Sequence, residues 1–79
     1  MKKLLEVIAT ALTDHPEDVL VMEREAEDGI ILELYVHEAD MGKVIGKQGR
    51  IAKAIRSVVK AAAIRENKRV MVEIAENLG

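Results

Sequence analysis

The chain has 79 residues and a formal net charge of −2; 49% of its residues are hydrophobic, and Tyr35 is its only Phe, Trp or Tyr. This composition predicts one folded domain with a small core and argues against RNA-binding modules that stack bases on exposed aromatic rings. The chain lacks cysteine, which excludes disulfides and thiolate zinc sites and is typical of the reducing cytoplasm. No apolar run is long enough to span a membrane, so we expect a cytoplasmic protein.

Charge is distributed unevenly along the chain. Residues 1–40 contain three basic and eleven acidic residues, a sum of −8, whereas residues 41–79 contain nine basic and three acidic residues, a sum of +6. The acidic run Glu23–Asp28 is interpreted as a solvated hairpin tip. The second half of the chain therefore predicts a basic surface suited to a polyanion, which the net charge alone conceals.

The first half of the chain predicts one helix and two strands. Apolar residues at helical spacing predict a helix over residues 2–13, and Pro16 keeps it from continuing because the residue before a proline avoids helical angles. Residues 19–26 and 30–36 predict strands. Because Asp28-Gly29 between them is typical of a tight hairpin turn, we expect these strands to pair antiparallel.

The second half predicts two helices and a third strand. Asp40 occupies the position of an N-cap ahead of a short helix over residues 41–45. A glycine-containing loop follows over residues 46–49, and apolar periodicity predicts a longer helix over residues 50–64. Alternating apolar residues predict the third strand over residues 69–75.

The order of these elements is α-β-β-α-α-β. Two helices separate the second and third strands, which is long enough for a right-handed crossover, so these two strands should be parallel. The sequence therefore predicts an α+β fold for residues 1–79, in which a mixed three-stranded sheet is covered on one face by three helices.

The loop Gly46-Lys47-Gln48-Gly49 has the features of a phosphate clamp. Glycine lets a ligand approach the backbone closely, and the amino end of the following helix presents unpaired N–H groups and partial positive charge. Arg50 and Lys43 add full charges beside the loop. A tight turn between helices with surface lysines is the alternative, and the glycine spacing fits neither a Walker A loop nor a dinucleotide-binding fingerprint.

The sequence from Val44 to Ile55, VIGKQGRIAKAI, resembles the IGxxG signature of the KH domain, a module that binds RNA and single-stranded DNA. The predicted element order resembles the type II topology of that domain, and the whole chain is similar to the small bacterial KhpA family of single-domain KH proteins. The resemblance implies that the loop 46–49 clamps the backbone of about four nucleotides, with Arg50 at its edge and the bases in an apolar groove beside it.

Other residues around the signature have two interpretations each. Val44, Ile45 and Ile51 are candidates for the groove or for the core beneath it. A set of basic residues on and after the longer helix either follows RNA phosphates or forms a solvated stripe. These residues are Lys53, Arg56 and Lys60, with Arg69 bordering the same region.

The resemblance implies a noncatalytic RNA-binding protein, an RNA chaperone or post-transcriptional regulator, whose ligand is single-stranded RNA or single-stranded DNA. One KH domain grips few nucleotides, so strong binding calls for a second module. That module would be a second copy joined through an apolar helix face, or a larger KH-containing protein similar to KhpB.

A protein-interaction module that keeps the KH fold without using the loop is the alternative function. An enzyme is not predicted, because no hydroxyl lies in a nucleophile motif and His15 and His37 are isolated in the sequence. No cofactor and no metal is predicted either, since the acidic residues near the hairpin are better explained by solvation.

Overall fold

The structure is a computed structural model that describes residues 1–78. Its element order is the predicted one, and each helix or strand begins and ends within one residue of its predicted bounds. Short 3₁₀ turns that the sequence did not predict connect these elements at Pro16–Asp18 (η1), Glu38–Asp40 (η2) and Lys47–Gly49 (η3). The helices are α1 (Lys2–Leu12), α2 (Met41–Ile45) and α3 (Arg50–Arg65), and the strands are β1 (Leu20–Ala26), β2 (Gly29–Val36) and β3 (Val70–Glu76).

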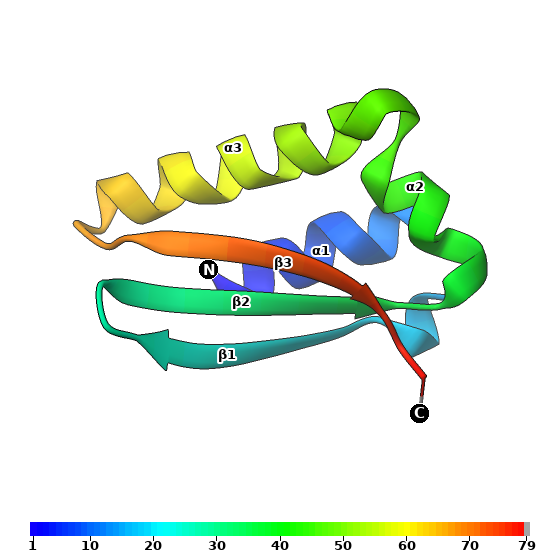
Figure 1. Ribbon diagram of the computed structural model, residues 1–79, viewed down its shortest axis with the longest axis horizontal. Coiled ribbons are helices and arrows are strands. Elements are labelled where there is room, and N and C mark those ends of the chain that lie inside the picture. Colours follow the sequence, from blue (N-terminus) through cyan, green and yellow to red (C-terminus); the bar gives the residue numbers. More distant parts are fainter. Residues whose placement is uncertain (79) are drawn as a thin grey trace.

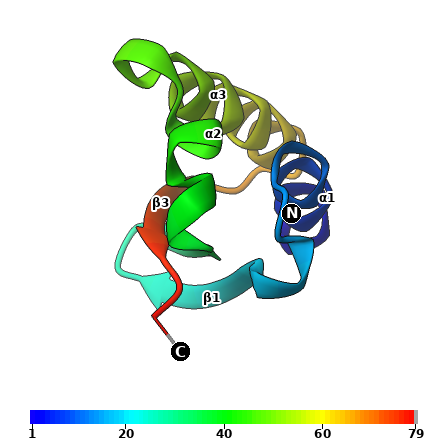
Figure 2. The ribbon, with the colours of Figure 1, turned by 90° about the vertical axis from the view of Figure 1, so that its right-hand side faces the viewer.

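The three strands form one mixed sheet in the order β1-β2-β3. β1 pairs antiparallel with β2, from Leu20 opposite Tyr35 to Ala26 opposite Gly29, and β3 pairs parallel with β2. All three helices lie on the same face of this sheet, as Figures 1 and 2 show from two sides. The predicted α+β fold, with a mixed three-stranded sheet covered on one face by three helices, is confirmed.

The core lies between the helices and the covered face of the sheet. Along β2, Leu32, Leu34 and Val36 are buried on this face, because alternate side chains of a strand point to the same side. The helices meet them with residues four positions apart, which share one helical face. The other core residues are Leu5 and Ala9 of α1, Val44 of α2, Ala52, Ile55, Val59 and Ala63 of α3, and Val21, Val70 and Val72 of β1 and β3.

The end of α3 turns the chain toward β3 through a left-handed residue. Asn67 has a φ of 60°, and the N–H of Lys68 donates to the carbonyl oxygen of Ala63 at 2.8 Å across the turn. Asparagine adopts this backbone region more readily than most residues, which suits it to this position after a helix. The turn starts β3 alongside β2, so β3 becomes the sheet edge that lies next to α3.

Candidate nucleic-acid interface

The loop that joins α2 to α3 is a tight turn with three positive φ angles. The φ angles of Gly46, Gln48 and Gly49 are 76°, 57° and 73°. The N–H of Gly46 donates to the carbonyl oxygen of Gly42 at 2.9 Å, and the N–H of Gly49 donates to that of Gly46 at 3.1 Å. Strained backbone at Gln48, a residue with a Cβ, is of the kind that concentrates at functional sites.

The two glycines of the loop are needed for different reasons. A Cβ on Gly46 would lie 2.6 Å from Cγ1 of Ile51, so a side chain there would collide with the first turn of α3. A Cβ on Gly49 would meet no atom within 4 Å, so only the backbone angle calls for glycine there. The space over Gly49 is therefore open, and a ligand can approach the backbone closely at this point.

Helix α3 begins at this opening. Its N-cap is Gly49, which has no side chain to satisfy the N–H groups of the first helical turn; the N–H of Arg50 donates to the carbonyl oxygen of Lys47, which leaves the groups that follow it. Those groups and the helix dipole favour an anion. Lys47 and Gln48 are exposed beside them, and the guanidinium of Arg50 donates to Oε1 of Gln48 at 3.2 Å. The loop thus combines backbone donors with cationic side chains, which is the chemistry of a phosphate site.

A basic groove of about 500 Å³ lies between α3 and β3. Arg56 is fixed at its wall, because Nε donates to the backbone oxygen of Val72 at 3.1 Å. An apolar floor with basic walls suits nucleotides, since their bases have apolar faces and their phosphates are anionic. The other lining residues are Lys60, Arg69, Val70 and Met71.

The apolar residues predicted for the site lie at or in the core. Val44 is fully buried in the core, so it has no surface with which to contact a ligand. Ile45 and Ile51 are half-buried and pack against the same core. Among the predicted basic residues, Lys53 is exposed on α3.

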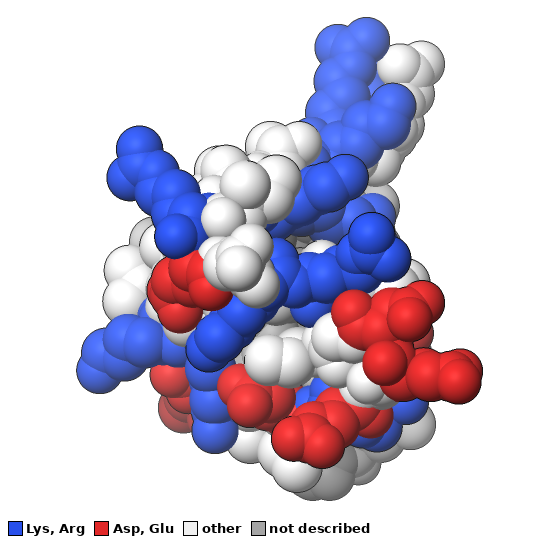
Figure 3. All heavy atoms as spheres, turned by 90° about the vertical axis from the view of Figure 1, so that its left-hand side faces the viewer, with Lys and Arg blue, Asp and Glu red and all other residues white. Residues whose placement is uncertain are grey.

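Charge is separated between the helix side and the strand side of the molecule. In Figure 3, Lys and Arg side chains spread mainly over the upper part of the surface, where α3 lies, whereas Asp and Glu gather mainly in the lower part. The basic surface expected from the second half of the chain is thus centred on α3. Its basic residues are Arg50, Lys53, Arg56, Lys60 and Arg65.

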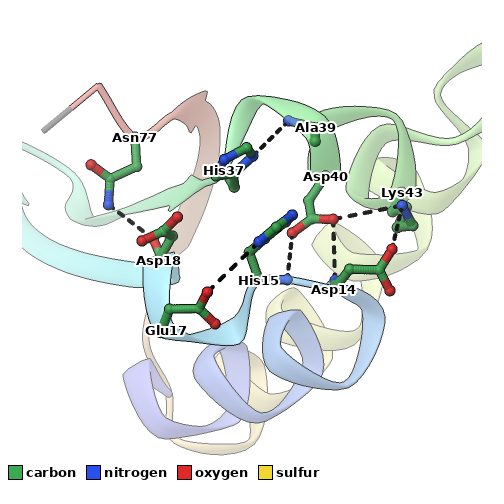
Figure 4. Close-up of polar contacts among 9 residues, drawn as sticks. All are labelled: Asp14, His15, Glu17, Asp18, His37, Ala39, Asp40, Lys43 and Asn77. Atoms are coloured by element: carbon green, nitrogen blue, oxygen red, sulfur yellow. Dashed lines mark hydrogen bonds and ion pairs between the residues drawn. The ribbon is translucent and has the colours of Figure 1, made fainter.

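A polar cluster that the sequence did not predict joins the start of α2 to the segment after α1 (Figure 4). The Asp40 carboxylate is fully buried, and its oxygens accept the N–H of Asp14 at 3.1 Å and the N–H of His15 at 2.9 Å. Nζ of Lys43 lies 2.9 Å from Oδ2 of Asp14 and 3.6 Å from Oδ1 of Asp40. We call Asp14, His15, Asp40 and Lys43 the Asp40 latch.

The prediction that Asp40 caps α2 is wrong for its side chain. Asp40 does occupy the N-cap position, but its carboxylate makes no cap hydrogen bond and bonds instead to residues 25 and 26 positions away. The two backbone donors satisfy its oxygens better than one N–H of a five-residue helix would. Lys43, predicted as an RNA contact, is likewise engaged within the protein.

Asp40 and Lys43 keep their charges over a wide pH range. Burial raises the pKa of Asp40. The hydrogen bonds from the N–H groups of Asp14 and His15, together with nearby positive charge, lower it by a larger amount. The pKa therefore lies below its ordinary value. The pKa of Lys43 is raised, first by its hydrogen bond to Asp14 and then by the charge of that carboxylate. A charged carboxylate and a charged amine therefore face each other near neutral pH.

The two histidines, isolated in the sequence, stack on each other in the structure. Their ring centroids are 4.1 Å apart, and Nδ1 of His37 accepts the N–H of Ala39 at 3.0 Å. Residues 1–78 contain no group of three or more His, Asp or Glu placed to hold a metal ion. The same residues form no helix that is both long and apolar enough to cross a bilayer.

A second groove, almost entirely apolar and about 490 Å³ in volume, lies between α1 and α3. Val58 in this groove is 48% exposed and Leu12 is 37% exposed, although both lie on the apolar stripes of their helices. Apolar side chains that the chain itself leaves uncovered indicate a surface for a partner. The other lining residues are Leu4, Ile8, Arg50, Ile51, Ala54 and Ile55.

Known proteins resemble this chain in sequence and in fold. The KH-domain family described as KhpA/KhpB matches residues 2–74. The RNA-binding proteins KhpA of Clostridium perfringens and Bacillus subtilis are 70% and 50% identical to this chain over 74 residues, 94% of this chain and 99% and 91% of those proteins. The crystal structure of Aquifex aeolicus Era bound to GDP and AlF4− matches with a TM-score of 0.69 and 22% identity, over 95% of this chain and 29% of Era, and so shares the fold. This chain therefore belongs to the KhpA/KhpB family of KH domains.

Proposed function

We propose that this chain is a noncatalytic RNA-binding protein that holds the backbone of single-stranded RNA with the loop 46–49. The observation that carries the proposal is the open, positive-φ backbone of Gly49 at the amino end of α3. A phosphate over Gly49 would accept hydrogen bonds from the N–H groups that follow Arg50 in the first turn of α3, and would face the side chains of Lys47 and Arg50. Relatives 70% and 50% identical to this chain are named RNA-binding proteins KhpA, which supports this ligand.

From the loop, the RNA continues along the basic groove between α3 and β3. Met71, which is 60% exposed, offers apolar contact to bases. Arg56 and Lys60 lie one helical turn apart on α3 and face phosphates. Few polar groups in this groove read base edges, so sequence preference is modest. Such binding fits an RNA chaperone or post-transcriptional regulator of the cytoplasm, and single-stranded DNA offers the same phosphates and bases.

The apolar groove between α1 and α3 joins two clamps into one binding unit. A second copy of the chain, seated on this groove, would cover Val58 and Leu12, which the chain leaves exposed. Linking two sites raises avidity by about 10²–10⁴ when both can be engaged at once. The related KH domain of KhpB is the other candidate partner, because one family description covers both proteins.

The competing function is a protein-interaction module that uses the apolar groove and leaves the loop 46–49 idle. The exposed apolar groove favours this function as well, since it is a partner surface in either case. The two functions differ in one measurable property, which is whether the loop carries the affinity for RNA.

The test replaces Lys47 and Gln48 by Asp, because carboxylates beside a phosphate repel it. We expect the K47D/Q48D variant to bind a short single-stranded RNA at least about tenfold more weakly, measured by fluorescence anisotropy. The control is K2D/K3Q, which changes the net charge by the same −3 at exposed positions in the first turn of α1. Undiminished RNA affinity in a folded K47D/Q48D protein would overturn the clamp.

The salt dependence of binding gives an independent test. Each phosphate engaged on a single strand contributes about −0.7 to the slope of log affinity against log salt concentration. The clamp therefore predicts a clearly negative slope for the wild-type protein. A slope near zero would favour the interaction module.

A further inference from the structure

We infer that the Asp40 latch, through its Asp14–Lys43 ion pair, positions the loop 46–49. The Asp40 latch fixes α2 against the segment that follows α1, and α2 in turn sets the position from which the loop meets RNA. This inference rests on the proposed function for its effect on RNA binding. The latch itself is a feature of the free protein and can be tested there.

The placement of the Asp40 carboxylate indicates a specific structural task. A buried carboxylate is costly unless donors and a cation compensate its charge. Here the compensation is complete, because both oxygens accept backbone N–H groups and Nζ of Lys43 lies 3.6 Å from one of them. Both backbone donors come from the segment after α1, so the carboxylate holds two distant parts of the chain together.

Lys43 carries this restraint along α2 to the loop. Its amine bridges the carboxylates of Asp14 and Asp40, which commits it to the protein. α2 has only five residues and ends at Ile45, directly before the loop. The N–H of Gly46 donates to Gly42, so the first loop residue is hydrogen-bonded into the helix that the latch holds. A rotation of α2 would therefore displace the loop.

Further contacts brace the same corner of the molecule. The stacked rings of His15 and His37 connect the two segments that the latch joins, and Figure 4 shows them beside the Asp40 carboxylate. On the other side of η1, the side-chain amide of Asn77 donates to the carbonyl oxygen of Asp18 at 2.9 Å. These contacts give Asp40 a rigid partner to hold, which a positioning residue requires.

Simple electrostatics and the latch make opposite predictions for the loss of an acidic residue here. Removing a negative charge from a protein that binds RNA should leave RNA affinity unchanged or raise it. Removing the Asp14 carboxylate should instead lower RNA affinity if Lys43 needs that carboxylate to hold α2. The direction of the change therefore separates the two explanations.

The experiment compares Asp14→Asn with Glu38→Gln. The Asp14 side chain is 71% exposed, so D14N should fold, and it loses the ion pair with Lys43 while keeping the backbone bond to Asp40. Glu38 is an exposed acid in η2, so E38Q removes the same charge close to the latch. We expect D14N to bind RNA about two- to fivefold more weakly than E38Q. Equal affinity of the two variants would overturn the inference.

A second variant, Lys43→Gln, distinguishes a positioning role from direct phosphate contact. If Lys43 positions α2, RNA affinity falls but the salt slope stays at the wild-type value. If Lys43 contacts a phosphate, the slope becomes less negative by about 0.7, and the inference is wrong for this residue.

NMR signals of the backbone N–H groups in the free protein test the latch without RNA. We expect the N–H signals of Gly46 and Gly49 to shift in D14N and to keep their positions in E38Q, a change that a loss of global stability alone would not produce. Unshifted glycine signals in D14N would overturn the latch. If instead the glycines shift but wild-type protein fails to bind RNA, the latch stands and the proposed function is overturned.

Discussion

The two flanks of α3 carry opposite chemistry. The flank that faces β3 presents Arg56 and Lys60 over a floor of strand residues, whereas the flank that faces α1 presents Ala54 and Val58 in an apolar groove. Each pair is four residues apart, so each occupies one side of the helix. In the proposed function, one helix thus serves RNA on one flank and a partner chain on the other without competition between them.

The two flanks meet at the first turn of α3. Ile51 packs against Gly46 of the loop and also lines the apolar groove, while Arg50 belongs to the proposed clamp and borders the same groove. Along most of its length α3 separates the basic groove from the apolar groove. At its first turn, a change in Arg50 or Ile51 would affect both the loop 46–49 and the apolar groove.

The largest effect is expected from Val58→Lys. A charged side chain in the apolar groove should prevent self-association and lower the affinity for an RNA that spans two clamps by about 10²-fold. A short RNA that fills one clamp should bind as before. Sedimentation and fluorescence anisotropy measure the two quantities.

The matched control for that prediction is Met22→Lys. Met22 is 47% exposed, nearly the same as Val58, but lies on β1 away from both grooves. A V58K protein that associates as M22K does would show that the apolar groove is not the contact between copies.

Substitutions of the glycines probe the coupling at the first turn. Gly46→Ala should destabilise the fold by about 2–3 kcal/mol, because its Cβ pushes against Ile51. It should weaken both RNA binding and self-association. Gly49→Ala should cost about 1 kcal/mol and weaken RNA binding alone.

Urea unfolding and RNA titration test this ranking, with Gly42→Ala as the control. Gly42 lies in α2, where an added Cβ would meet no atom within 4 Å, so alanine should stabilise the protein by up to about 1 kcal/mol. If G49A disturbs self-association as much as G46A does, the coupling does not act through Ile51.

A smaller effect is expected from Arg56→Gln on the basic flank. Losing the guanidinium should lower RNA affinity about threefold to tenfold and make the salt slope less negative by about 0.7, while self-association is unchanged. The control Arg65→Gln removes the same charge in the last turn of α3, outside the groove. An identical slope in the two variants would exclude a phosphate contact at Arg56.

The smallest effect is expected from pH. Because the pKa of Asp40 is lowered from 3.8, its contribution to stability is present above 3.8 and is lost as pH falls through the lower folded value. Because the pKa of Lys43 is raised from 10.5, its contribution is present below 10.5 and is lost as pH rises through the folded value. Carboxyl ¹³C titration should place the Asp40 midpoint below 3.8; a midpoint above it would contradict the latch.

The fold is predictable because each α-helix and each strand carries a local signal in the sequence. The apolar spacing in residues 2–13, the Asp28-Gly29 turn and the two helices before the third strand fix the elements and the pairing of the strands. The observed helix and strand bounds differ from the predicted ones by no more than one residue.

The site is predictable only where its signal is local. Gly46 and Gly49 lie within the loop whose backbone they shape, so the sequence motif alone locates them, and both have positive φ in the structure. The Asp40 latch joins residues 25 and 26 positions apart, and a polar residue before a helix looks the same in sequence whether it caps or bridges. Likewise, periodicity marks Val58 as apolar but cannot tell whether its cover belongs to the same chain.

The parallel pairing of β2 with β3 has a consequence for the order of events during synthesis. β2 ends at Val36 and β3 begins at Val70, so the hairpin of β1 and β2 can form early, whereas the parallel pair must wait for α2, the loop and α3. Since β3 supplies one wall of the basic groove, the groove closes only after the clamp loop has been translated. A nascent chain therefore carries the loop 46–49 before the groove between α3 and β3 has formed.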